Sequence, residues 1–173
     1  MMPADLPPLP SAARLQELLF DAARLGRDDV IPALLQAGAD IEGHDARGHS
    51  PLVLASYNGR ESTTALLLDQ GAMADGPGNA TGNSALIGVA FKGHAAIARL
   101  LLDAGAAVDH RNGAGQTALM MAALFGRTDI IDMLLAAGAD PAATDVQGSS
   151  AAGVAAAQGN DALAHRLAAL TRA

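Results

Sequence analysis

Apolar residues recur along the chain in short clusters that are separated by polar turns. In the segment 128–137 the cluster occupies positions i, i+1, i+4 and i+5: Ile130, Ile131, Leu134 and Leu135. The same order occurs earlier in the chain, at Val30, Ile31, Leu34 and Leu35. Because residues with this spacing lie on one side of an α-helix, each cluster predicts a short helix with one buried stripe.

Glycine recurs with the period of these clusters. One set has spacings of 33, 34, 33 and 33 residues: Gly26, Gly59, Gly93, Gly126 and Gly159. A second set has spacings of 33, 34 and 33: Gly38, Gly71, Gly105 and Gly138. A third has spacings of 34, 33 and 33: Gly48, Gly82, Gly115 and Gly148. Three independent sets with one period indicate a chain built from repeats of about 33 residues.

The unit 112–144 shows how one repeat is expected to fold. Gly115 lies in a polar tight turn, where a positive φ is inexpensive only for glycine. Thr117 follows as the predicted N-cap of a first helix. The same place is held in other units by Ser50, Ser84 and Ser150.

Two helices are expected in this unit. The first covers 118–125 and ends at Gly126, and the second covers about 128–137 and ends at Gly138. Helices this short are marginal alone and cannot bury their own apolar stripe. Stacked pairs share one continuous core, so the repeats predict an all-α solenoid.

The segment Asn112–Asp140 resembles the ankyrin repeat at almost every framework position. The resemblance implies about five helix-turn-helix repeats with β-turn or hairpin finger loops. We expect a disordered lead-in over 1–12 and one domain over 13–173. Its repeats would cover about 13–44, 45–78, 79–111, 112–144 and 145–173.

The chain departs from the ankyrin pattern at several places. The family's usual histidine at the start of the first helix is replaced by Val53, Ile87, Met120 and Gly153. Thr63 and Thr64 replace an expected Ile/Val pair, which predicts a weak point in the second repeat. Pro32 falls early in a second helix, at its fourth position if Asp28 is the N-cap.

One extra residue lies between the second and third repeats, within Gly76-Pro77-Gly78. Two interpretations remain open: a tolerated loop insertion, which costs little entropy, or a reshaped binding loop.

Composition narrows the function. The 173 residues include 11 Lys or Arg and 18 Asp or Glu, for a net charge of −7, and contain no Cys. No run of basic residues is present, which argues against nucleic acid and against an anionic membrane surface as ligand. No apolar stretch reaches 18 residues and the first residues do not resemble a signal peptide, so we expect a cytoplasmic protein.

The resemblance also implies that the two residues before each first-helix glycine face a concave groove. Three of the four aromatic residues fall there in consecutive repeats: Tyr57, Phe91 and Phe125. Exposed aromatic rings are typical anchors of protein interfaces. The alternative is that these rings only pack over neighbouring helices of the stack.

We therefore expect a monomeric, non-catalytic module that binds a protein partner through this face and needs no cofactor. The predicted partner-binding residues are Arg47, His49, Tyr57, Asn58, Asn83, Phe91, Lys92, Gln116, Leu124 and Phe125. An alternative is a dedicated inhibitor or immunity protein for a co-encoded enzyme or toxin, whose basic site the acidic chain would mask.

A catalytic or metal-binding role is the third hypothesis. His44, Asp45, His49 and Ser50 lie close together in the sequence. A hydrolase needs such groups to converge in a pocket, whereas these four sit on or beside one exposed turn and Ser50 is better placed as a helix cap. We expect no catalytic residue and no metal ligand.

Overall fold

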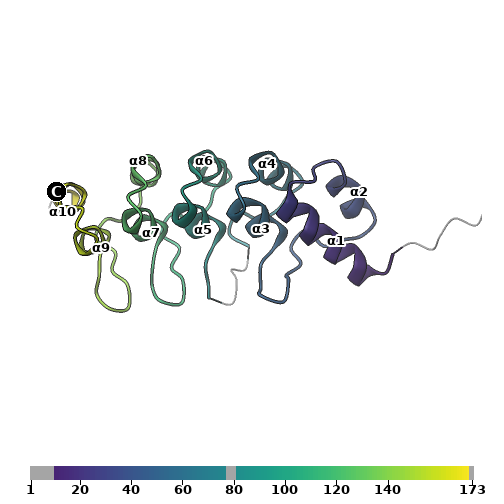
Figure 1. Ribbon diagram of the computed structural model, residues 1–173, viewed down its shortest axis with the longest axis horizontal. Coiled ribbons are helices and arrows are strands. Elements are labelled where there is room, and N and C mark those ends of the chain that lie inside the picture. The colour runs from purple at the N-terminus through teal and green to yellow at the C-terminus, as the bar shows by residue number, and fades with distance from the viewer. Residues whose placement is uncertain (1–9, 77–80, 172–173) are drawn as a thin grey trace, which may run out of the picture.

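The computed structural model describes residues 10–76 and 81–171. Within them the chain forms ten α-helices, arranged as five successive pairs (Figure 1). In chain order they are α1 (Ala12–Leu25), α2 (Ile31–Gln36), α3 (Pro51–Tyr57), α4 (Glu61–Asp69), α5 (Ala85–Lys92), α6 (Ala95–Asp103), α7 (Ala118–Leu124), α8 (Thr128–Ala136), α9 (Ala151–Ala157) and α10 (Asp161–Leu170).

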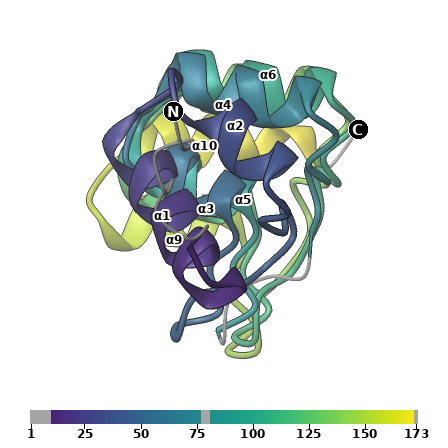
Figure 2. The ribbon, with the colours of Figure 1, turned by 90° about the vertical axis from the view of Figure 1, so that its right-hand side faces the viewer.

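The helices lie in two rows. The first row holds α1, α3, α5, α7 and α9, and the second row holds the even-numbered helices (Figure 1). Each first-row helix packs on its neighbours in that row and on its own second helix. The loops that join one helix pair to the next project to one side of the stack, as the view along the stack shows (Figure 2). The predicted all-α repeat fold is confirmed.

The predicted N-caps of the first helices are confirmed. The hydroxyl oxygens of Ser50, Ser84, Thr117 and Ser150 each accept a hydrogen bond from the N–H three residues on, at 3.3 to 3.4 Å. Each such cap typically stabilises its helix by about 1 kcal/mol relative to alanine. The repeat therefore restarts at the same residue type for a local reason.

The predicted glycine turns are confirmed as well. Gly115 has φ of 74° and Gly126 has φ of 61°, in the left-handed region that glycine enters without strain. The helix before Gly126 ends one residue earlier than expected. Leu124 is the last residue of α7, and Phe125 is its C-cap.

The prediction for the start of α2 was wrong. Val30 is the N-cap and makes no side-chain cap hydrogen bond, so Pro32 stands at the second helical position, not the fourth. The reason lies in the next repeat. Asp28 accepts a hydrogen bond from the hydroxyl of Thr63, which draws its carboxylate away from the helix start. Proline at the second position costs no intrahelical hydrogen bond.

Thr63 and Thr64 are both fully buried, yet neither hydroxyl lacks a partner. Thr63 donates to Asp28, and Thr64 donates to the carbonyl oxygen of Arg60 at 2.8 Å. A buried hydroxyl is costly only when it is unsatisfied. The predicted weak point is therefore a place where two repeats are joined by a polar contact.

The core is aliphatic and runs the length of the stack. Its largest fully buried side chains are Leu, Ile and Met, among them Leu19, Leu67, Leu101 and Leu134. Alanines at the contacts between first-row helices allow the close approach that such short helices need. Ile87 and Met120, in place of the family's histidine, join this core.

Consecutive loops are joined backbone to backbone. The N–H of Gly113 donates to Thr81 O at 2.9 Å, and the N–H of Val146 donates to Ala114 O at 3.0 Å. A Cβ at Gly82 would lie 3.1 Å from the nitrogen of Gly113, so glycine makes this approach possible. These contacts join the loops before α5, α7 and α9, which project beneath the first helices (Figure 1).

Two predictions lie outside the described residues. Most of the lead-in, residues 1–9, is among them, while α1 begins at Ala12. The inserted segment Gly76-Pro77-Gly78 is described only at Gly76.

Candidate functional site

Tyr57, Phe91 and Phe125 form a continuous cluster across three repeats, which we call the aromatic strip. The rings of Tyr57 and Phe91 are stacked, with centroids 6.3 Å apart, and Phe125 meets Phe91 edge to face at 4.8 Å. The three residues are 40%, 39% and 42% exposed, respectively. The rings therefore pack on one another and still present a large apolar surface to solvent.

The strip depends on a glycine in the next helix. A Cβ at Gly88, on α5, would lie 3.2 Å from Cδ2 of Tyr57. Because Gly88 has no side chain, the Tyr57 ring can rest against α5 and reach Phe91. The sequence pattern alone did not single out Gly88, because it belongs to none of the three periodic sets.

Two cations lie against the strip. Lys92 Nζ is 5.1 Å from the centroid of the Tyr57 ring, and Arg127 Cζ is 5.9 Å from the centroid of the Phe125 ring. At exposed sites such contacts contribute about 0.5–1 kcal/mol each. Both side chains are exposed, so the strip carries positive charge along its edge.

A further row of contacts runs through the residues that follow the first-helix glycines. Cβ atoms built at Gly26, Gly59 and Gly93 would lie 3.1, 2.9 and 2.8 Å from side-chain atoms of Arg60, His94 and Arg127, respectively. Each of these side chains thus crosses the glycine of the preceding repeat.

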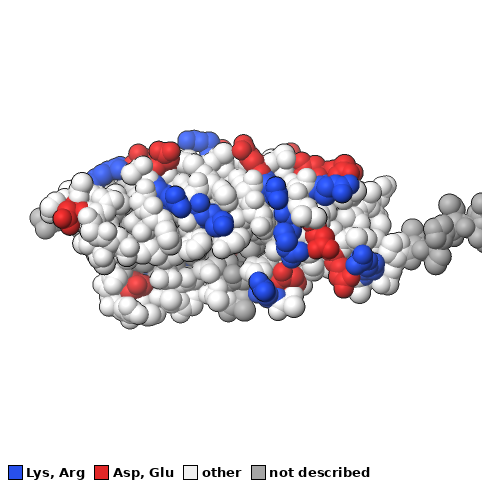
Figure 3. Space-filling model, in the orientation of Figure 1, with Lys and Arg blue, Asp and Glu red and all other residues white. Residues whose placement is uncertain are grey.

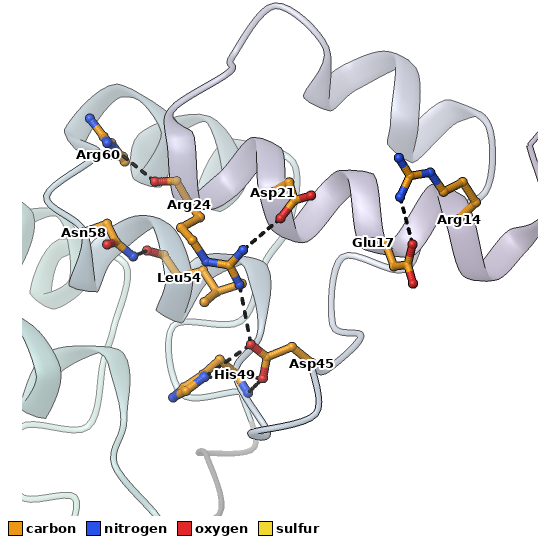
Figure 4. Close-up of polar contacts among 9 residues, drawn as sticks. All are labelled: Arg14, Glu17, Asp21, Arg24, Asp45, His49, Leu54, Asn58 and Arg60. Atoms are coloured by element: carbon orange, nitrogen blue, oxygen red, sulfur yellow. Dashed lines mark hydrogen bonds and ion pairs between the residues drawn. The ribbon is translucent and has the colours of Figure 1, made fainter.

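Two of these crossing side chains also meet the end of the preceding helix. Arg60 Nε donates to Arg24 O at 3.1 Å (Figure 4). His94 Nε2 is 3.3 Å from Tyr57 O. Cations and donors suit the carbonyl-rich end of a helix. The sequence analysis missed this row, although a basic residue one place after Gly59, Gly93 and Gly126 was a usable signal.

A groove of about 770 Å³ opens at the Tyr57 end of the strip. Its walls come from α3, α5, the end of α1 and the loops before α3 and α5. The predicted site residues in its lining are Arg47, His49, Tyr57, Asn58 and Asn83. Phe91, Lys92, Leu124, Phe125 and Gln116 are not part of that lining.

Not every predicted residue is equally available. Leu124 is half-buried and packs against the core. Gln116 accepts a hydrogen bond from Asn112 Nδ2 at 3.0 Å, and the same group donates to Asn83 at 2.8 Å. Asn58 Nδ2 donates to Leu54 O at 2.7 Å, at the end of its own helix (Figure 4).

Asp45 organises the wall of the groove. It accepts the N–H groups of Arg47 and His49, both at 2.9 Å, and lies 3.3 Å from the His49 ring and 3.8 Å from Arg24 (Figure 4). Burial acts to raise the pKa of Asp45. The hydrogen bonds from His49 and Arg47 outweigh that effect and hold the pKa below its usual value.

The contacts of Asp45, His49 and Ser50 in this turn indicate a structural role better than a catalytic one. Ser50 is buried and its hydroxyl is engaged as the cap of α3, and the Asp45 carboxylate serves its own loop. In residues 10–76 and 81–171, no group of three or more His, Cys, Asp or Glu could hold a metal ion. None of the helices described is long and apolar enough to cross a bilayer.

Charge is unevenly distributed over the face shown in Figure 3. Acidic and basic atoms gather along the second-row helices and over α1, whereas the loops beneath α7 and α9 are mostly uncharged.

The chain matches the model of a known family. The family described as ankyrin repeats (3 copies) matches residues 19–112 and 77–145. No curated protein matches the chain.

Proposed function

Since the chain belongs to the ankyrin-repeat family and is a protein–protein interaction module, we propose that it binds its partner on the concave face that carries the aromatic strip. The observation that carries the proposal is the strip itself. Three rings from consecutive repeats touch one another and each keeps about two-fifths of its surface exposed. Rings needed only for packing would be covered more completely.

The energetics indicate how much the strip can contribute. A ring side chain of roughly 200 Å² that is 40% exposed would bury about 80 Å² more on binding, worth about 2 kcal/mol. Three rings together give about 6 kcal/mol, less than the roughly 8 kcal/mol of a micromolar complex. Contacts from the polar rim and the groove are therefore part of the proposed interface.

The rim that we propose comprises the remaining predicted residues: Arg47, His49, Asn58, Asn83, Lys92, Gln116 and Leu124. The binding unit is the domain over 13–173, acting as a monomer without catalytic residues or cofactor. The alternative of an inhibitor that masks a basic site rests on net charge alone.

The test is a double substitution, Tyr57→Ala with Phe91→Ala, used in affinity capture from native lysate. The matched control is Met73→Ala with Leu170→Ala. Those two residues are 54% and 45% exposed, and they lie after α4 and at the end of α10, away from the strip. We expect the strip variant to lose partner capture by at least about tenfold, because a tenfold change needs only about 1.4 kcal/mol. The control should capture as the wild type does.

A photo-crosslinking residue at position 125 should label the same partner, and one at position 170 should not. Folding of each variant is checked by circular dichroism at 25 °C. If the strip variant unfolds, the rings belong to the core and the proposal fails. If it stays folded and captures the partner unchanged, the concave face is the wrong surface.

A further inference from the structure

The charges near the aromatic strip differ from those of the whole chain. With 18 acidic and 11 basic residues, most cations are expected to find a carboxylate nearby. Several do: in the described residues Arg14 pairs with Glu17, Arg27 with Asp29, and Arg166 with Asp132. Arg24, at the edge of the groove, is held by both Asp21 and Asp45.

Four cations beside the groove and the strip form no ion pair within residues 10–76 and 81–171: Arg47, Arg60, Lys92 and Arg127. All four are exposed. Their present contacts are with neutral groups. Lys92 and Arg127 lie against rings, Arg60 donates one N–H to a carbonyl, and Arg47 lines the groove.

Carboxylates are absent from the first-row helices α3, α5 and α7, although Glu61 follows Arg60 and Asp129 lies two residues after Arg127. No Asp or Glu occurs in three segments, which contain α3, α5 and α7 together with loop residues before each helix: 46–60, 81–102 and 110–128. Asp45 is the acidic residue that lines the groove, and it is already engaged by Arg24, His49 and two backbone N–H groups. The binding face of an acidic protein is thus locally basic.

From this arrangement we propose that the partner segment is acidic and apolar: a peptide whose aromatic or aliphatic side chains cover the strip while its Asp and Glu side chains reach Lys92, Arg127, Arg60 and Arg47. The inference rests on the proposed function and specifies the partner's chemistry. An unpaired cation at the rim of an apolar contact gains from a carboxylate brought to it as water is excluded. A basic segment would meet four like charges. Asp45 is already engaged, and Glu61 and Asp129 lie beyond Arg60 and Arg127, at the starts of the second-row helices α4 and α8.

A single-stranded nucleic acid also offers anions and flat apolar groups, because phosphates suit the cations and bases stack on rings. The basic residues stand singly rather than in the run or patch that a phosphate backbone needs. The peptide is the occupant that the charges favour, and the oligonucleotide serves as a competitor in the test.

The test uses a displayed library of random 12-residue peptides, selected on the full chain. We expect the selected peptides to be enriched in Asp and Glu next to Phe, Trp, Tyr or Leu. Affinity of one selected synthetic peptide should fall on the order of tenfold with Lys92→Glu, because attraction becomes repulsion at the rim. It should also weaken as salt is raised.

The matched control is Arg99→Glu, which changes the net charge equally. Arg99 lies on α6 in a shallow depression that also contains Asp103, Asp129 and Asp132, away from the strip. We expect the control to change the affinity by less than about twofold, because Arg99 lies on the second row among carboxylates and its charge is screened by salt. Melting curves confirm that both variants are folded.

Distinct outcomes separate the two proposals. Enrichment of Lys and Arg in the selected peptides, or equal effects of K92E and R99E, would overturn the acidic partner and leave the concave site intact. A poly-dT oligonucleotide that displaces the peptide and binds more tightly would overturn it as well. Selected peptides that bind Y57A/F91A as well as the wild type, or a library that yields no binder, would count against the proposed function itself.

Discussion

The two rows of helices share one architecture and differ in surface chemistry. In the second row, α4, α6 and α8 carry acidic residues at their exposed positions and no aromatic ring: Glu61, Asp69, Asp103, Asp129 and Asp132. In the first row, α3, α5 and α7 carry no acidic residue and end at the aromatic strip. Both rows bury a comparable aliphatic stripe, so packing alone does not require the difference.

The comparison separates two demands on one repeat. The core asks only for small and branched aliphatic side chains at fixed intervals, and both rows supply them. The exposed positions are free to vary, and in the first row they carry rings and unpaired cations. This difference between the two rows agrees with the proposed binding role of the first-row surface.

The largest expected effect belongs to the second row. Leu101, on α6, is fully buried, so Leu101→Ala should lower the free energy of unfolding by about 3 kcal/mol through lost burial and a cavity. Urea denaturation measures it. At 25 °C the folded variant should keep wild-type partner capture. A loss of capture in protein that is still folded would break the separation between the two rows.

A smaller effect is expected from two glycines in first-row helices. Gly153→Ala, on α9, would place its Cβ in nearly open space, so the gain in helix propensity should stabilise the chain by about 0.5–1 kcal/mol. Gly88→Ala should gain less, because its Cβ would displace the Tyr57 ring from 3.2 Å. Thermal melting compares the two.

A measurement of partner capture distinguishes the two glycine variants further. Gly88→Ala should weaken it and Gly153→Ala should leave it unchanged, because only the first disturbs the aromatic strip. Equal capture by the two variants would show that the position of Tyr57 against α5 does not matter for binding.

The smallest effect concerns pH. The pKa of Asp45 is lowered in the folded chain from an ordinary value of 3.8, so its carboxylate stabilises the fold above that value. The contribution is lost as the pH falls through the lowered pKa. Asp45→Asn should therefore show a shallower loss of stability than the wild type between about pH 4 and pH 2. Parallel curves for the two proteins would exclude this role.

Local sequence was sufficient to predict the helix pairs and their caps. Thr117 and Gly126 specify a start and an end by contacts within a few residues, so position along the chain is enough. The start of α2 was mispredicted because Asp28 has two uses. Its bond to Thr63 joins residues 35 positions apart, and no local rule reveals that choice.

The candidate site was predictable only in part, for the same reason. The period placed Tyr57 and Phe91 in equivalent positions and Phe125 one residue later in its repeat, and the structure brings the three rings into contact. The side-chain conformations that place Lys92 over Tyr57 and Arg127 across Gly93 depend on the neighbouring repeat. Side-chain direction between repeats is set by packing, which a period does not encode.

The groove lies beside Tyr57, at one end of the aromatic strip, and Phe125, at the other end, meets Phe91 edge to face. Without this difference, nearly identical repeats would offer a bound peptide similar contacts in several registers and in both chain directions. The groove at one end and the ring of Phe125 at the other make the two ends of the strip different. A bound chain would then have one preferred direction of travel and one alignment, even though the scaffold beneath it is almost periodic.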